Sequence, residues 1–128
     1  MAYFGTPINE SPVIALKAGA DIKGDFLAVE ITETGVTLPA TAGAAAIGIL
    51  IPGQEVKNGD TVAVQVKDMG KWTTGAAVAA GDPLTTDTNG KCIKATSGKF
   101  ILGFALEAAT AADVPINVQI TKSGYMTA

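Results

Sequence analysis

The sequence predicts an all-β protein, a small barrel or sandwich built from two pseudo-repeated halves and preceded by an extended N-terminal arm. Three observations predict this fold. Residues 35–51 recur as residues 90–106 at a constant offset of 55, apolar residues alternate with polar ones in several runs, and glycine-containing turn signals separate those runs. Because a unit of this size buries little apolar surface alone, we expect the two copies to cover each other around one core.

The arm is predicted over residues 1–13, which show no alternation and contain Pro7 and Pro12. Prolines at that spacing favour an extended segment, although a disordered tail is the simpler alternative. Tyr3 and Phe4 stand out in a chain with only 5% aromatic residues, and aromatic side chains bury large areas when they dock. We therefore expect Tyr3, Phe4, Pro7 and Ile8 to contact a neighbouring subunit or partner.

Residues 14–128 are predicted to form a single β domain. Alternating apolar residues indicate half-buried strands at 26–31, 61–67 and 114–121, with inward faces formed by Leu27, Val29 and Ile31, by Val62, Val64 and Val66, and by Ile116, Val118 and Ile120. Gly-Asp pairs at 24–25, 59–60 and 81–82 are typical of the turns that precede strands. The alanine-rich segments 76–80 and 105–112 lack a long apolar stripe, so they are predicted to be loops or single turns.

The internal repeat extends beyond its best-matching part, to residues 35–66 and 90–120, with one residue lost in a loop of the second copy. Gly48 and Gly103 should occupy equivalent positions where two strands approach too closely for a side chain. At the same offset, Cys92 corresponds to Thr37, which favours a small strand residue over a nucleophile.

Composition argues against an enzyme. The chain has no histidine, and its nine basic residues are all lysine, so neither a neutral-pH proton shuttle nor a bidentate guanidinium is present. Glu30 and Glu33 are more typical of solvated strand ends than of a catalytic pair. Asp82, Asp87 and Asn89 lack the spacing of a calcium loop and favour hairpin turns. We therefore predict no catalytic residues, no cofactor and no metal.

Charge and hydropathy limit the partners. The net charge of −3 predicts no nucleic-acid binding, no apolar run is long enough to span a bilayer, and the N-terminus has no secretion signal. We expect synthesis in a cytoplasm and no membrane partner. Residues 1–56 carry two lysines against six carboxylates, whereas residues 57–128 carry seven against six. This asymmetry fits an ordinary solvated surface or head-to-tail complementarity between subunits.

The run from Val78 to Ile120 resembles the C-terminal half of bacteriophage capsid decoration, or cement, proteins, and residues 14–66 resemble them more loosely. A Gly-Asp turn, an Asx-Gly-Lys hairpin, a glycine-flanked strand and a terminal Val-x-Val-like strand carry the resemblance, at Gly81, Asp82, Leu84, Asn89, Gly90, Lys91, Gly103, Ala105, Leu106, Ala108, Val118 and Ile120. The resemblance implies a β domain on the outer capsid surface that binds the major capsid protein and stabilises the shell, often as a homotrimer at local three-fold positions.

Two other functions fit the same residues. Tail tubes, fibres and spikes are also virion parts made of small repeated β domains. A carbohydrate- or protein-binding module is a further alternative, and it would need an exposed aromatic platform. Trp72 is the only tryptophan, and it is a candidate for such a platform or for a capsid or subunit contact. A core tryptophan is the competing interpretation.

Overall fold

The computed structural model describes residues 12–51 and 55–127, and within these ranges the secondary structure is entirely β. Ten strands follow one another along the chain: β1 (Val13–Lys17), β2 (Ala28–Thr32), β3 (Gly35–Thr37), β4 (Gly48–Leu50), β5 (Thr61–Gln65), β6 (Asp68–Thr73), β7 (Pro83–Thr86), β8 (Cys92–Lys94), β9 (Phe100–Ala105) and β10 (Pro115–Tyr125). The alanine-rich segments form loops between β6 and β7 and between β9 and β10, as predicted.

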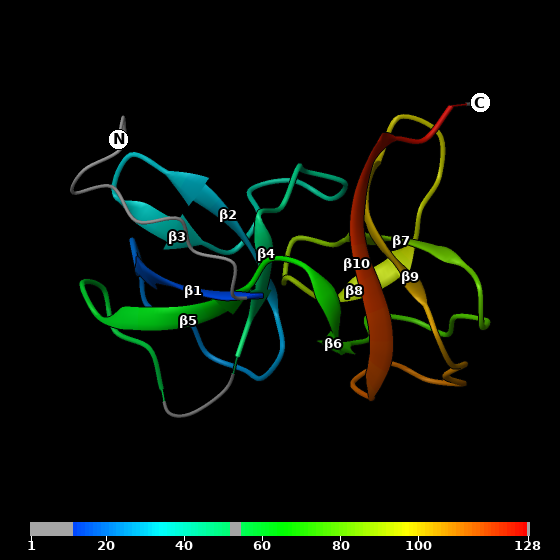
Figure 1. Cartoon of the computed structure of the whole chain (residues 1–128), viewed down its shortest axis with the longest axis horizontal. Helices are drawn as coiled ribbons and strands as arrows, with labels where there is room; N and C mark the ends of the chain where they lie inside the picture. Colours follow the sequence, from blue (N-terminus) through cyan, green and yellow to red (C-terminus); the bar gives the residue numbers. More distant parts are fainter. Residues whose placement is uncertain (1–11, 52–54, 128) are drawn as a thin grey trace, which may run out of the picture.

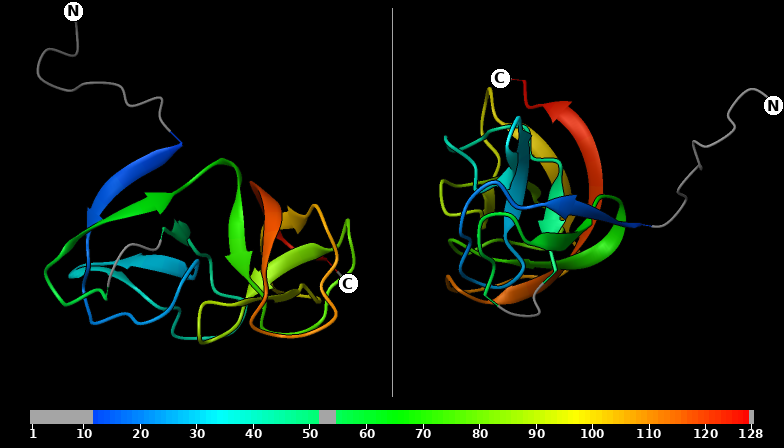
Figure 2. Two further views of the ribbon diagram at one scale, coloured as in Figure 1. Left: turned by 90° about the horizontal axis from the view of Figure 1, so that it is seen from below. Right: turned by 90° about the vertical axis from the view of Figure 1, so that its left-hand side faces the viewer.

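The strands form two five-stranded antiparallel sheets that pack against each other as a sandwich (Figures 1 and 2). The order in the first sheet is β1-β5-β4-β2-β3, and in the second it is β6-β10-β9-β7-β8. The two orders match when β1 is aligned with β6, β2 with β7, β3 with β8, β4 with β9 and β5 with β10. We call β1–β5 the first half and β6–β10 the second half. The two pseudo-repeated halves predicted from the sequence are present, and the correspondence includes every strand of the described chain rather than only residues 35–66 and 90–120.

Gly48 and Gly103 are equivalent, as predicted. Gly48 pairs with Val29, and Gly103 pairs with Leu84 at the same place in the second sheet. A Cβ atom at Gly48 would collide with the backbone oxygen of Gln65, and one at Gly103 would collide with that of Gln119. Glycine is therefore required by the same close approach of two strands in both halves.

The predicted partner of Cys92 in the repeat was wrong. Cys92 pairs with Thr86, as Val36 pairs with Ile31, so its equivalent is Val36 rather than Thr37. The paired residues Thr86 and Cys92 have one more residue between them than the paired residues Ile31 and Val36, and this shifts the offset to 56. The Asp87 carboxylate holds the longer turn, because it accepts hydrogen bonds from the backbone N–H groups of Asn89 and Lys91, each at 2.9 Å.

Each sheet curls around apolar residues of its own. A single parallel bridge joins the end of β1 to β3 through Ala18 and Val36, and Thr74 with Cys92 forms the equivalent bridge in the second half. Neither sheet closes into a barrel. The expectation of one shared core is therefore corrected, because a buried cluster lies inside each half.

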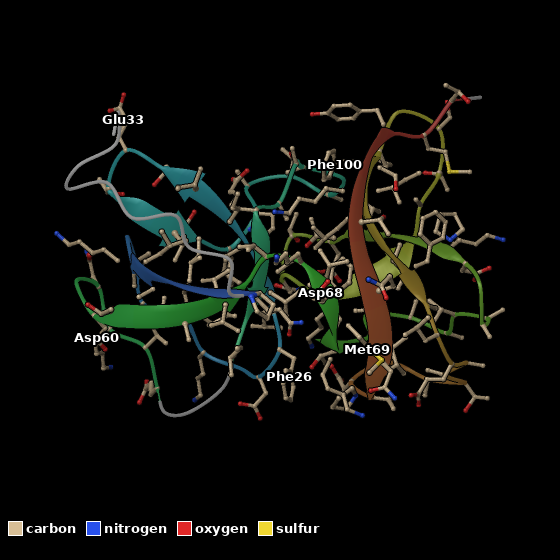
Figure 3. All side chains as sticks on the ribbon, viewed as in Figure 1. Phe26, Glu33, Asp60, Asp68, Met69 and Phe100 are labelled. Atoms are coloured by element: carbon tan, nitrogen blue, oxygen red, sulfur yellow. The ribbon has the colours of Figure 1, made fainter. Side chains whose placement is uncertain are left out.

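The halves are joined by apolar residues of the first half that enter the cluster of the second. Ala28, Ala46 and Ile49 lie on the outer face of the first sheet, and they belong to the cluster built around Trp72, Leu84 and Leu102. Phe26 and Phe100 pack against this cluster, and Figure 3 shows both at the boundary between the halves. The contact is asymmetric: an outer face of one half meets the interior of the other.

Candidate interaction surfaces

The contact residues expected in the arm, Tyr3, Phe4, Pro7 and Ile8, lie outside the described residues. The fifth, Trp72, lies in the core with no exposed surface. Its indole N–H donates a hydrogen bond to the backbone oxygen of Gly90 at 2.8 Å, so its single donor is satisfied inside the protein. In the described fold, Trp72 thus has the burial expected of a core tryptophan and offers no aromatic platform to a sugar.

The boundary between the halves is held by backbone hydrogen bonds as well as by apolar contacts. The N–H of Ala28 donates to Gly90 O at 2.7 Å, and that of Gly43 donates to Thr86 O at 2.8 Å. Thr73 donates twice in the opposite direction, from its N–H to Phe26 O at 3.0 Å and from its hydroxyl to Asp25 O at 2.6 Å. These bonds hold the end of β6 and the β7–β8 hairpin against the first half.

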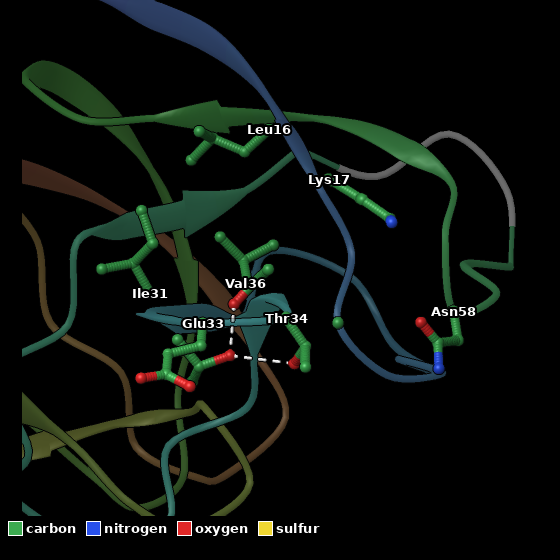
Figure 4. A pocket seen from close by; sticks show the side chains of 10 residues that line it. Leu16, Lys17, Ile31, Glu33, Thr34, Val36 and Asn58 are labelled. Atoms are coloured by element: carbon green, nitrogen blue, oxygen red, sulfur yellow. Dashed lines mark hydrogen bonds between the residues drawn. The ribbon is translucent and has the colours of Figure 1, made fainter.

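A hollow of about 470 Å³ opens at the far end of the first half (Figure 4). We call it the end hollow. Its walls come from β1, the β2–β3 hairpin and the loop before β5, and include Leu16, Lys17, Ile31, Glu33, Val36 and Asn58. The hairpin is braced by the Thr32 hydroxyl, which donates to Gly35 O at 2.7 Å. The end hollow thus combines an apolar floor with one cationic and one anionic side chain.

Ile31 is the residue of the end hollow that departs from the sequence prediction. It was expected to be buried with Leu27 and Val29, which are indeed buried, but 60% of its surface is exposed. The strand continues past the covered part of the sheet, so Ile31 points toward an open end. The sequence carried no signal of this exposure, because the equivalent residue of the second half, Thr86, is polar and yet buried.

A second apolar surface lies on the outer face of the second half. Met69 pairs with Gln119, Gln119 with Phe104, and Phe104 with Pro83, which places these four residues in one row across the sheet. Met69 is 61% exposed, and Phe104 and Pro83 are half-buried. We call this row with the neighbouring Ile101 the outer row. The outer row thus places apolar side chains next to one another across three neighbouring strand pairs.

Three groups that could be reactive, the Cys92 thiol and the carboxylates of Glu30 and Asp82, have structural surroundings: the thiol is buried and each carboxylate accepts a backbone hydrogen bond. Burial raises the pKa of the Cys92 thiol to about 12, so the thiol stays protonated at neutral pH and is a poor nucleophile. Glu30 accepts a hydrogen bond from Ala40 N at 3.0 Å, and Asp82 accepts one from Ala79 N at 2.9 Å. In residues 12–51 and 55–127, no three potential metal ligands come together.

The fold thus defines a small two-sheet β domain, and its described surface includes exposed apolar residues such as Ile31 and Met69. Comparison with known sequences identifies the family: the model of the phage cement proteins matches residues 15–120, so this chain belongs to the phage cement protein family. The family implies a structural role in the virion rather than catalysis.

A solved structure has a similar fold. The chain matches the head fiber gp8.5 N base of bacteriophage phi29 with a TM-score of 0.65 and 18% sequence identity, covering 89% of this chain and 97% of the other. No protein with a curated function matches the sequence. None of the described segments forms a helix long and apolar enough to cross a membrane.

Proposed function

We propose that this protein is a head cement protein that binds the outer surface of an icosahedral phage capsid and bridges neighbouring major capsid subunits. The observation that carries the proposal is the family match over residues 15–120. The exposed apolar residues of the end hollow and of the outer row support it, since a protein that acts by contact alone needs such surfaces.

Stabilisation would follow from mass action. A protein that binds the assembled shell but not its separated subunits lowers the free energy of the assembled state, by about 2.7 kcal/mol per site when its free concentration is 100 times the Kd. When the protein bridges two neighbouring capsid subunits, its contacts add to the contacts that the two subunits make with each other. The result is a shell that opens at a higher temperature.

The test compares heads with and without the protein. Heads that lack it should release packaged genome at a lower temperature and in milder low-salt treatment, and adding the purified protein back should restore the release temperature. Fluorescence of a DNA-binding dye during heating measures this release. Equal release temperatures with and without the protein would contradict the cement role.

We further propose that the arm contributes to attachment through Tyr3, Phe4, Pro7 and Ile8. Deletion of residues 2–11 should leave far-UV circular dichroism unchanged and weaken binding to heads by about tenfold or more, because burial of one large apolar side chain is worth roughly 1.5–3 kcal/mol. A matched control replaces the same residues with an equally long Gly/Ser segment. Undiminished affinity of the deletion variant would place attachment on the β domain.

The protein would act as a homotrimer at local three-fold positions of the shell, where symmetric sites favour cyclic oligomers. A second candidate is the base of a head fibre, favoured by the similarity to the phi29 head fiber base. Electron microscopy of particles carrying a labelled protein distinguishes the two. Cement produces regular knobs over the whole head, whereas a fibre base places the label beneath projecting fibres.

A further inference from the structure

The end hollow occupies a place in the first half that is filled in the second. Leu16 pairs with Val62 as Trp72 pairs with Ile116, and Ile31 pairs with Val36 as Thr86 pairs with Cys92. The equivalents of Leu16 and Ile31 are therefore Trp72 and Thr86. Both are covered, with exposures of 0% and 1%, because the first half of the same chain packs over them.

The residues that provide this cover have open equivalents too. Ala28 pairs with Ile49 as Pro83 pairs with Phe104, and Ala46 corresponds to Ile101 in the sequence repeat. Ala28, Ala46 and Ile49 are buried in the cluster of the second half. Their equivalents Pro83, Ile101 and Phe104 are half-buried in the outer row, although all three are larger. Within one chain, the outer face of the first half thus covers the interior of the second half. The equivalent pair of surfaces, the outer row and the end hollow, stays open.

We propose that the outer row of one molecule docks over the end hollow of a second copy of this chain, repeating between copies the contact that joins the halves within each copy. The open surfaces lie toward opposite ends, since β1 and β3 form one end of the molecule and β7 and β9 lie toward the other (Figure 1). A contact between two different faces is heterologous, and it closes into a ring or continues as a chain. This contact would join the copies of the homotrimer, so it rests on the proposed function.

Charge favours the same orientation. The sequence up to residue 56 carries four more negative than positive charges, whereas the rest carries one more positive than negative. Head-to-tail docking places the basic half of one copy against the acidic half of the next, and side-by-side docking of like halves does not.

The contact between copies should be weaker than the contact within a chain. The N–H of Ala28 donates to Gly90 inside the molecule, but its equivalent, Pro83, has no N–H to donate. The Gly98 N–H, equivalent to that of Gly43, already donates to Met126 O. Apolar burial must therefore supply most of the affinity, so self-association is expected to be reversible and concentration-dependent.

The experiment uses the full chain in sedimentation velocity. Ile31→Asp blocks the end hollow and Phe104→Asp blocks the outer row, and each should weaken self-association by about tenfold or more. Met69→Asp is a second outer-row variant that leaves the half-buried Phe104 intact, because Met69 is largely exposed. Val114→Asp is the matched control, since Val114 is also apolar and exposed but lies in neither surface, and it should associate like the natural chain.

Mixing gives the sharpest result. Ile31→Asp retains a working outer row and Phe104→Asp retains a working end hollow, so two variants that are monomeric alone should form a 1:1 heterodimer together. A mixture that stays monomeric, or a natural chain that is monomeric up to about 1 mM, overturns the proposal. The proposal is also overturned if only one of the variants Ile31→Asp and Phe104→Asp loses self-association. If these variants instead lose only binding to heads, the shell is the occupant, and the cement role stands while self-docking fails.

Discussion

The two halves share a strand order and a register, but the ends of their sheets are closed differently. The open end of the second half is covered by Ala28, Ala46 and Ile49 of the first, and a tryptophan fills its interior. The first half has the smaller Leu16 at the equivalent position, and Ile31 faces solvent beside it. The difference shows that a repeat unit has two complementary faces, and that burial at a given position depends on whether a neighbouring unit covers it.

The largest expected effect compares Trp72→Ala with Leu16→Ala. Trp72 is fully buried, so its truncation should lower the free energy of unfolding by about 3–5 kcal/mol. Leu16 occupies the equivalent position beside the end hollow and is half-buried, so its truncation should cost roughly 1–2 kcal/mol. Urea unfolding followed by circular dichroism measures both. Equal costs would show that the two positions are covered to the same extent.

The presence of two equivalent halves could be predicted from the sequence. Glycines that are required by close backbone contact, such as Gly48 and Gly103, recur at the same place in both copies of the repeat. The asymmetry could not be predicted. Whether Ile31 is buried depends on the half that packs against its sheet, and alternation along one strand carries no information about that. The offset at Cys92 was missed for a local reason: one residue was added within the Asp87 turn, where ungapped alignment still matches glycine with glycine.

The second comparison concerns pH and the pair Cys92 and Val36. Burial raises the pKa of the Cys92 thiol from 9.0 to about 12. A thiol with a raised folded-state pKa contributes full stability below pH 9, and loses it as the pH rises toward 12, since the unfolded chain releases its proton first. The loss should be at most about 4 kcal/mol, from 1.36 kcal/mol per pH unit.

Cys92→Val installs the residue found at the equivalent position of the first half and removes this titration. The difference in unfolding free energy between the natural chain and Cys92→Val should therefore change between pH 9 and pH 12, with the variant gaining relative stability. All other side chains are common to both proteins, so their contributions cancel in the difference. A difference that stays constant over this pH range would mean that the thiol is accessible to solvent.

The third comparison tests the equivalence of the halves directly. Gly48→Ala and Gly103→Ala each push a methyl group against a backbone oxygen of the neighbouring strand, so each should cost about 1–3 kcal/mol and the two costs should agree. Gly98→Ala is a control in which the new methyl group meets no atom and only the positive φ of +83° causes strain. Thermal unfolding of the three variants measures the costs. A large effect at one of the two paired sites only would contradict the shared strand geometry.

The smallest effect arises where the halves differ in polarity. Thr85 in β7 is buried, and its hydroxyl has no hydrogen-bond partner, whereas the equivalent Glu30 is less buried and accepts a bond from Ala40. Thr85→Val keeps the shape and removes the unpaired hydroxyl, so it should raise the free energy of unfolding by about 1 kcal/mol. The neighbouring Thr86 is equally buried, but its hydroxyl donates to Asp87 O at 2.8 Å, so Thr86→Val should destabilise by about the same amount. Urea unfolding of the two variants separates an unpaired hydroxyl from a paired one at adjacent positions, and a loss of stability in Thr85→Val would show that its hydroxyl is bonded after all.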